Sequence, residues 1–210
     1  MNSFKYILIS IVLIVSVGCG AWYWNSKHHK KLDTEMIDAA RTGDDGAVRS
    51  LIAKGANIEV NAQEGAFQTP TTPLMTAVFQ GHERVVKVLL ESGADANHIP
   101  AGGSGTALGE AAAAGHDKIV QLLLDKGANV ELGVPEKKVT PLMMAAWRGR
   151  ASTVRLLLAK RANPKAKNTS GETALDYAYK LLRLRPSLWE KDQHPHETTQ
   201  ILKQIQIKGQ

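Results

Sequence analysis

Cysteine is nearly absent from this 210-residue sequence, because Cys19 is the single one. The chain can therefore form no internal disulfide, and the region after residue 19 offers no cysteine nucleophile and no cysteine metal ligand. No serine or threonine is placed beside a base in a pattern typical of nucleophilic catalysis. The sequence therefore indicates a protein that is not an enzyme and that needs no cofactor.

Nucleotide-binding and metal-binding patterns are missing as well. The segment 101–105 reads A-G-G-S-G, but it lacks the Gly-Lys-Ser/Thr ending of a phosphate-binding loop, so we interpret it as a flexible loop. Histidines pair at His28-His29 and at His194 and His196 without a third ligand at a defined spacing. We therefore predict neither a metal site nor a small-molecule substrate site.

Negative charge is missing from two stretches of the chain. Residues 1–31 and 137–171 hold no acidic residue, and 137–171 carries nine basic ones. Residues 32–136 hold 15 acidic and 7 basic residues, so the net charge of +6 conceals an acidic first part and a basic later part. Trp147 is the only aromatic residue within the basic stretch, which argues against nucleic acid as a partner. An acidic protein partner, anionic lipid, and plain solvation of these side chains are the interpretations left open.

Charged residues are also absent from the 19 residues 6–24. As a helix this stretch spans about 28 Å, which is close to the roughly 30 Å core of a bilayer. Aromatic residues at 22–24 end the stretch, and lysines follow at 27, 30 and 31, an order typical of a membrane interface. The sequence therefore predicts an N-terminal flank at 1–5, a single transmembrane anchor at 6–24 and a linker at 25–33.

The same N-terminal stretch admits two processed forms. Residues 16–19 read S-V-G-C and resemble a bacterial lipoprotein box, in which Cys19 is lipidated and becomes the mature N-terminus. In the other form the stretch is an ordinary signal that is removed. An anchored or lipidated chain is held at a membrane in the cell envelope, and we expect the rest of the chain on the exterior, periplasmic face. The lysines after the span favour the opposite, cytoplasmic side.

A segment of 33 or 34 residues recurs in the remaining sequence. The triplet Thr72-Pro73-Leu74 returns with threonine at 106, 140 and 173, and glycine follows nine residues later at 81, 115 and 149. Threonine caps the start of a short helix, and glycine ends it. An apolar second helix follows in each copy. Because such short helices are unstable alone, each unit must bury its faces against its neighbours in a stacked array.

These residues resemble the ankyrin repeat family, whose usual wording is T-P-L-H-x-A-A-x-x-G-H followed by V-V-x-L-L-L-x-x-G-A-D-x-N. The resemblance covers residues 34–182. It implies an all-α ankyrin repeat solenoid of about five helix-turn-helix repeats at 34–184, and we expect a helix at 197–207 within 185–210 to cap its open end. The motif histidine is replaced at Met75, Gly109, Met143 and Asp176, which we expect to loosen the array. His82 and His116 share one repeat position and are predicted to be structural.

The resemblance also implies the function, which is that of a non-catalytic protein-protein interaction module. In the family, the residues after the paired small residues of the first helix face the concave binding groove. Matched residue by residue, these positions are Arg41-Thr42, Phe79-Gln80, Ala113-Ala114, Trp147-Arg148 and Lys180-Leu181. Phe79 and Trp147 are expected to be exposed aromatic anchors. We predict Trp147 as the centre of the surface, ringed by positive charge that suits a partner with an acidic rim.

Two alternative functions belong to other classes. The first is an immunity or inhibitor protein that neutralises a toxin enzyme in the cell envelope. A toxin-like enzyme encoded next to this protein would favour it. The second is a metal or redox accessory protein, which would require the paired histidines to hold a metal.

Overall fold

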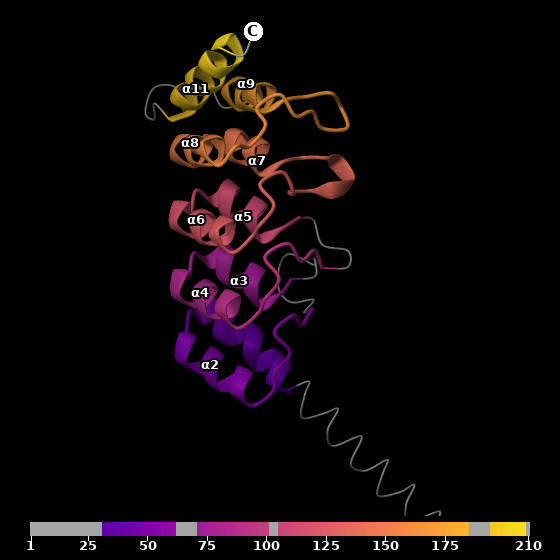
Figure 1. The fold of residues 1–210 in the computed structure, drawn as a ribbon, viewed down its shortest axis with the longest axis vertical. Helices are drawn as coiled ribbons and strands as arrows, with labels where there is room; N and C mark the ends of the chain where they lie inside the picture. The colour runs from indigo at the N-terminus through magenta and orange to yellow at the C-terminus, as the bar shows by residue number, and fades with distance from the viewer. Residues whose placement is uncertain (1–30, 62–70, 101–104, 185–193, 209–210) are drawn as a thin grey trace, which may run out of the picture.

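The computed structural model describes residues 31–61, 71–100, 105–184 and 194–208 (Figure 1). These residues form helices and no extended strand, so the prediction of an all-α repeat array is confirmed. The predicted anchor at 6–24, Cys19 and most of the linker lie outside the described residues. Within the described ranges, no helix is both long enough and apolar enough to cross a membrane.

Each repeat contributes one inner helix, which comes first in sequence, and one outer helix, and the two kinds form two parallel stacks (Figure 1). The inner helices are residues 31–42, α3 (Pro73–Gln80), α5 (Ala107–Ala114), α7 (Pro141–Trp147) and α9 (Ala174–Leu184). The outer helices are α2 (Asp45–Ala53), α4 (Glu83–Glu91), α6 (Asp117–Asp125), α8 (Ala151–Ala159) and α11 (His194–Lys208). Loops project from the inner stack, and one of them holds the 3-10 helix η2 (Pro135–Lys137). We number these helix pairs repeats 1 to 5.

The predicted caps begin and end the inner helices. The hydroxyls of Thr72, Thr106 and Thr140 accept a hydrogen bond from the backbone N–H three residues later, at 3.2 to 3.3 Å. Gly81 and Gly115 end α3 and α5 with φ of 79° and 82°. This left-handed conformation favours glycine because it has no Cβ. The turn residues therefore explain why α3 and α5, with eight residues each, stop at the same place, whereas α7 ends at Trp147 and α9 runs on to Leu184.

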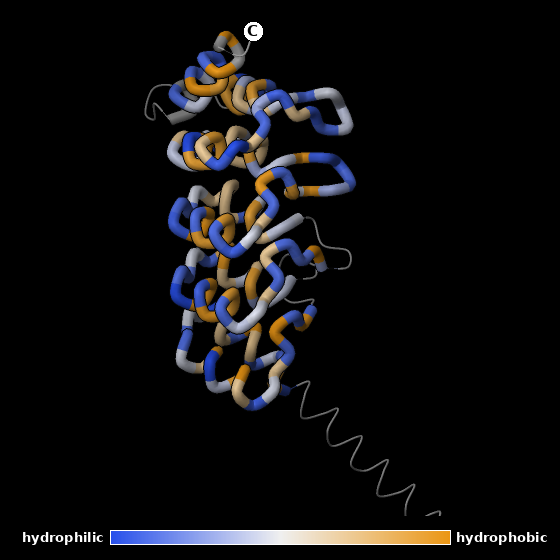
Figure 2. The backbone as a smooth tube through the Cα atoms, viewed as in Figure 1, coloured by the Kyte–Doolittle hydropathy of each residue, from blue (hydrophilic) through white to orange (hydrophobic). Residues whose placement is uncertain are grey.

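Two columns of equivalent leucines form the centre of the array. The inner column is Leu74, Leu108 and Leu142, and the outer column is Leu89, Leu123 and Leu157, all at most 2% exposed. Figure 2 shows hydrophobic residues where the two stacks meet and hydrophilic residues along the outward side of α4 and α6. Burying one such side chain stabilises the fold by about 1.5–3 kcal/mol. Each leucine is buried by its neighbours in adjacent repeats, so the repeats depend on one another.

Polar contacts join each repeat to the next. His82 Nε2 lies 3.0 Å from the Arg41 carbonyl oxygen, and Arg150, at the equivalent position in repeat 4, donates from Nε to the Ala113 carbonyl oxygen at 3.2 Å. The His116 ring packs against Gly81, where an added Cβ would lie 3.0 Å from its Cε1 atom. These side chains connect the turn of one repeat to the next, which is the structural role predicted for the histidines.

A second set of contacts joins the projecting loops. Carboxylate or amide oxygens of Glu59, Asn97 and Glu131 accept hydrogen bonds from the backbone N–H of a residue in the following loop, each at 2.7 Å. Each bond gives a loop backbone N–H group a partner in the preceding loop, so the loops hold a fixed register along the array.

The positions that lack the motif histidine are filled in other ways. Met75 and Met143 are buried, and the Met143 sulfur accepts the Thr140 backbone N–H at 3.5 Å. A Cβ at Gly109 would lie 2.9 Å from the Met144 sulfur of the next repeat, so the glycine makes room for that side chain. In repeat 5, the Asp176 carboxylate accepts from the Thr173 backbone N–H at 2.8 Å and from its hydroxyl at 2.7 Å.

The C-terminal end of the array differs from its middle. The helix expected at 197–207 is α11, which begins earlier, at His194, and packs against α9 and α8 (Figure 1). It buries Thr198, Thr199 and Leu202. On α9, Asp176 and Tyr179 are exposed, whereas the equivalent residues of repeat 4 are buried. This side of α9 is therefore built to face water.

Candidate functional site

The residues predicted to face the groove lie at or near the ends of the first four inner helices and in the middle of α9, on one side of the array that we call the inner face. Arg41, Phe79, Gln80, Arg148 and Lys180 are exposed there, and Ala113 and Trp147 are half-buried. The helical repeat places equivalent residues of successive helices side by side, because α3, α5, α7 and α9 pack in that order. The predicted residues thus belong to one continuous surface.

The two aromatic residues of this face differ in exposure. Phe79 is 51% exposed, as expected of an anchor residue. Trp147 is half-buried, and its ring meets the Tyr177 ring of repeat 5 in an edge-to-face arrangement, with 6.0 Å between the centroids and 78° between the planes. The expectation of a freely exposed tryptophan is therefore corrected. Trp147 and Tyr177 form a rigid aromatic pair that still reaches the surface.

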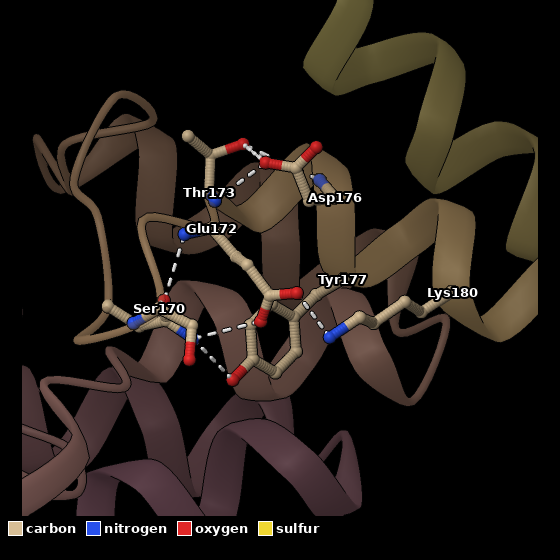
Figure 3. Close-up of polar contacts among 7 residues, drawn as sticks. Ser170, Glu172, Thr173, Asp176, Tyr177 and Lys180 are labelled. Atoms are coloured by element: carbon tan, nitrogen blue, oxygen red, sulfur yellow. Dashed lines mark hydrogen bonds and ion pairs between the residues drawn. The ribbon is translucent and has the colours of Figure 1, made fainter.

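A polar cluster continues from Tyr177 (Figure 3). The Lys180 ammonium lies 5.6 Å from the centre of the Tyr177 ring and forms an ion pair with Glu172. Asn168 donates from Nδ2 to the Tyr177 hydroxyl at 3.0 Å and to Glu172 at 3.1 Å. The hydrogen bonds from Lys180, and then from Asn168, hold the pKa of Glu172 below its usual range. Lys180 is therefore held in place by its neighbours.

Sequence reasoning missed Tyr177, Glu172 and Asn168. Tyr177 precedes Lys180 by three residues, so helical spacing alone could have placed it beside Lys180 on the same side of α9. The positions of Glu172 and Asn168 depend on the loop before α9, where Asn168 accepts from the backbone N–H groups of Ser170 and Glu172, each at 2.9 Å. Helical spacing predicts nothing about such a loop.

One acidic residue lies on the inner face of repeat 3. Glu110 is half-buried on α5, three and four residues before Ala113 and Ala114. Burial raises the pKa of its carboxyl group, and the positive charge of Arg148 in the next repeat opposes this only in part. An ionised carboxylate in this place carries a desolvation cost that Arg148 compensates only in part.

The basic stretch 137–171 divides into two groups. The first group is engaged within the array: Arg155 pairs with Glu197 of α11, Lys160 pairs with Asp125 at 3.0 Å, and Arg150 donates to the Ala113 carbonyl oxygen. The Arg150 side chain is thus engaged with repeat 3 through the Ala113 carbonyl oxygen. The exposed remainder lies on the inner face and the loops: Lys137, Lys138, Arg148, Arg161, Lys165 and Lys167.

Two neighbouring loops bring four lysines of this group together. Val134 and Val139 close the loop around η2 through paired backbone hydrogen bonds of 2.8 and 3.1 Å. The next loop attaches to it, because Thr169 donates its backbone N–H to the Lys137 carbonyl oxygen at 3.0 Å. Lys137 and Lys138 on the first loop and Lys165 and Lys167 on the second are thus exposed on adjacent loops. Their charge extends the positive surface beyond α7 and α9.

The hollows of this surface are shallow. One of about 370 Å³ is lined by Gly171, Glu172, Asp176, Tyr179, Lys180 and Arg183. Another, of about 380 Å³, lies at the opposite end of the array, between helix 31–42 and α2. In the described ranges, no three His, Cys, Asp or Glu side chains gather to hold a metal ion. The side chains of His194 and His196 lie outside that description. Open hollows of this kind suit contact with another macromolecule better than enclosure of a small substrate.

Comparison with known proteins identifies the repeats. A family model of ankyrin repeats (3 copies) matches residues 36–133, and a model of ankyrin repeats (many copies) matches residues 123–178. The two matches together run through the helices of repeats 1 to 4 and into α9. A search of curated proteins finds no match.

Proposed function

This chain belongs to the ankyrin repeat family, and on that premise we propose that its array is a non-catalytic protein-binding module that uses the inner face of repeats 3 to 5. The observation that carries the proposal is the Trp147–Tyr177 pair, with Arg148 and Lys180 beside it. Residues anchored in this way lose little freedom on binding, and aromatic and arginine side chains dominate the energetics of interfaces.

The partner in this proposal presents acidic residues. Arg148, Lys137 and Lys138 are exposed cations in a stretch that contains no acidic residue at all. Complementary charge of this kind raises the rate of association and selects the orientation of the partner. Lys180 is already paired with Glu172, so it contributes less free positive charge to this surface than Arg148 does.

The proposed location rests on the sequence. The uncharged stretch 6–24 with its aromatic and lysine flank supports a membrane tether in the cell envelope, with the array on the exterior face. Mass spectrometry of the N-terminus separates the two tethers, because a retained Met1 contradicts lipidation at Cys19. A toxin-inhibiting role would be a special case of the same binding surface, and it additionally requires an enzyme as the captured partner.

The test compares the full chain with three variants in affinity capture from membranes. Trp147→Ala is expected to weaken capture of a specific partner about thirtyfold, the loss of about 2 kcal/mol typical of a central aromatic. Arg148→Glu reverses the charge of an exposed side chain and is expected to weaken capture as well. Arg84→Ala, on the outer helix α4, is the matched control and leaves capture unchanged.

Thermal unfolding is measured beside capture, because Trp147 also packs against Tyr177. A partner that binds the Trp147→Ala and Arg148→Glu variants as well as it binds the parent chain would show that the inner face is not the binding surface.

A further inference from the structure

Two carboxylates of the described inner helices occupy the same repeat position, and only one of them forms an ion pair within its own repeat. Asp38 in repeat 1 and Glu110 in repeat 3 both lie four residues after the start of the repeat motif. Asp38 forms an ion pair with Arg41, three residues later on the same helix. The residue equivalent to Arg41 in repeat 3 is Ala113. The counter-ion that repeat 1 supplies to its own carboxylate is therefore missing in repeat 3.

The surroundings of Glu110 do not replace that counter-ion. In the described part of the chain, burial is the main influence on the pKa of Glu110 and raises it, Arg148 lowers it in part, and no hydrogen bond contributes. The equivalent residues of the neighbouring repeats, Thr76 and Met144, carry no charge. A half-buried carboxylate without a bonded partner destabilises the free protein and gains most from a cation brought by another molecule.

The side chains around Glu110 have the shape and chemistry to accept such a cation. Ala113 and Ala114 present only methyl groups, and they lie between exposed Phe79 of repeat 2 and half-buried Trp147 of repeat 4. Packed helices are about 8–10 Å apart, so each ring is one helix away from the alanines. A lysine or arginine side chain can lay its apolar stem over the two methyl groups and bring its charge to Glu110 near the face of an aromatic ring.

We propose that Glu110 and the alanines beside it form a subsite for one basic side chain of the protein partner. The partner's acidic residues then face Arg148 and the lysines of the two loops that follow. This inference rests on the proposed function and sharpens it, because the partner is no longer simply acidic. It is a segment whose charge changes sign along the array, and Glu110 sets the direction in which the segment lies.

The test uses a phage-displayed library of random 12-residue peptides, selected on the full chain and counter-selected on the Trp147→Ala variant. The selected peptides are expected to carry a lysine or arginine together with acidic residues. A double-mutant cycle then combines Glu110→Gln with replacement of that peptide base by glutamine. On the parent chain the base replacement is expected to weaken binding about tenfold, and on Glu110→Gln less than twofold.

Two controls keep the cycle interpretable. Glu91→Gln changes an exposed carboxylate on the outer helix α4 and is expected to show no coupling to the peptide base. Ala113→Arg rebuilds the repeat 1 arrangement in repeat 3 and is expected to weaken binding of the base-containing peptides about tenfold by occupying Glu110. The melting temperature of Glu110→Gln is expected to equal or exceed that of the parent chain, so a loss of binding is not a loss of folding.

The outcomes separate the two proposals. Peptides that depend on Trp147 but lack a base, or whose base shows no coupling to Glu110, overturn the subsite and leave the inner face as the binding surface. A partner captured from membranes that binds Trp147→Ala and Arg148→Glu as well as the parent chain contradicts the proposed function itself. A library that yields no peptide dependent on Trp147 counts against both.

Discussion

Repeat 3 ends its inner helix with Ala113 and Ala114, whereas repeat 4 ends its inner helix with Trp147 and Arg148. Under these surfaces the two repeats are built alike, with the same threonine cap and with Leu108 and Leu142 buried at the same place. We call the caps, turns and buried leucines the frame of the array. The comparison shows that this frame and the surface residues are separate features of the sequence. Residues outside the caps, turns and buried columns are available to differ between repeats.

Two cationic residues in or next to repeat 4 have a strained, left-handed backbone. Where repeat 3 has Gly127 in the left-handed conformation after its outer helix, with φ of 89°, repeat 4 has Arg161 with φ of 66°. Lys138, in the loop before repeat 4, is also left-handed, with φ of 50°. A residue with a Cβ is strained in this conformation by roughly 1 kcal/mol. Both strained residues are exposed cations, which is consistent with a surface under functional demand.

The largest expected effect tests whether the cores of repeats 3 and 4 are packed equally well. Leu108→Ala and Leu142→Ala should each lower the free energy of unfolding by about 3 kcal/mol, because each leaves a cavity in the inner column. Urea unfolding followed by circular dichroism measures both, with the exposed Arg84→Ala as the control. A difference of more than about 1 kcal/mol between the two leucines would break the comparison, since it would mean that one repeat is packed less well.

A smaller effect sharpens the contrast between the turns. Arg161→Gly should raise the free energy of unfolding by about 0.5–1 kcal/mol, because glycine relieves the left-handed strain. The reciprocal change, Gly127→Arg, should lower it by a similar amount, since no atom lies within 4 Å of an added Cβ and the strain acts alone. The same unfolding measurement decides. An Arg161→Gly variant that is less stable than the parent chain would mean that the arginine side chain makes compensating contacts.

The frame could be predicted from the sequence because its signals are local and repeated. Thr72, Thr106 and Thr140 mark helix starts by their own hydroxyl chemistry, and Gly81 and Gly115 mark the ends by their backbone freedom. A signal that recurs every 33 or 34 residues needs no knowledge of the tertiary contacts. The inter-repeat stacking then follows, because the short helices have no other way to bury their apolar sides.

The surface could be predicted only in part, because its properties depend on pairs of residues from different repeats. The exposure of Trp147 is limited by Tyr177, which lies 30 residues later in the chain. The basic stretch contains no acidic residue, yet Arg155 and Lys160 find theirs in Glu197 and Asp125, outside that stretch. Local sequence carries no signal for such partners.

Glu110 was missed for a different reason. The family pattern directs attention to the end of each inner helix, and Glu110 lies one turn before that end. Its importance appears only when repeat 3 is compared with repeat 1, where Asp38 has Arg41 as its partner. A comparison of repeats within this one sequence could have found it.

The smallest expected effect compares two carboxylates of the inner helices that respond to pH in opposite directions. Burial raises the folded-state pKa of Glu110, so the stability it contributes is complete below its unfolded pKa of about 4.3 and is lost as pH rises through the folded value. Hydrogen bonds from Thr173 lower the folded-state pKa of Asp176, so its contribution is present above its unfolded pKa of about 3.9 and is lost as pH falls through the folded value.

Glu110→Gln should therefore be at least as stable as the parent chain at pH 7, and Asp176→Asn less stable, with both differences shrinking toward pH 3. Melting temperatures between pH 3 and pH 7 measure this. If Glu110→Gln is less stable than the parent chain at pH 7, the carboxylate already has a stabilising partner within the array, and the cation that we assign to a second protein would have no vacant place to fill.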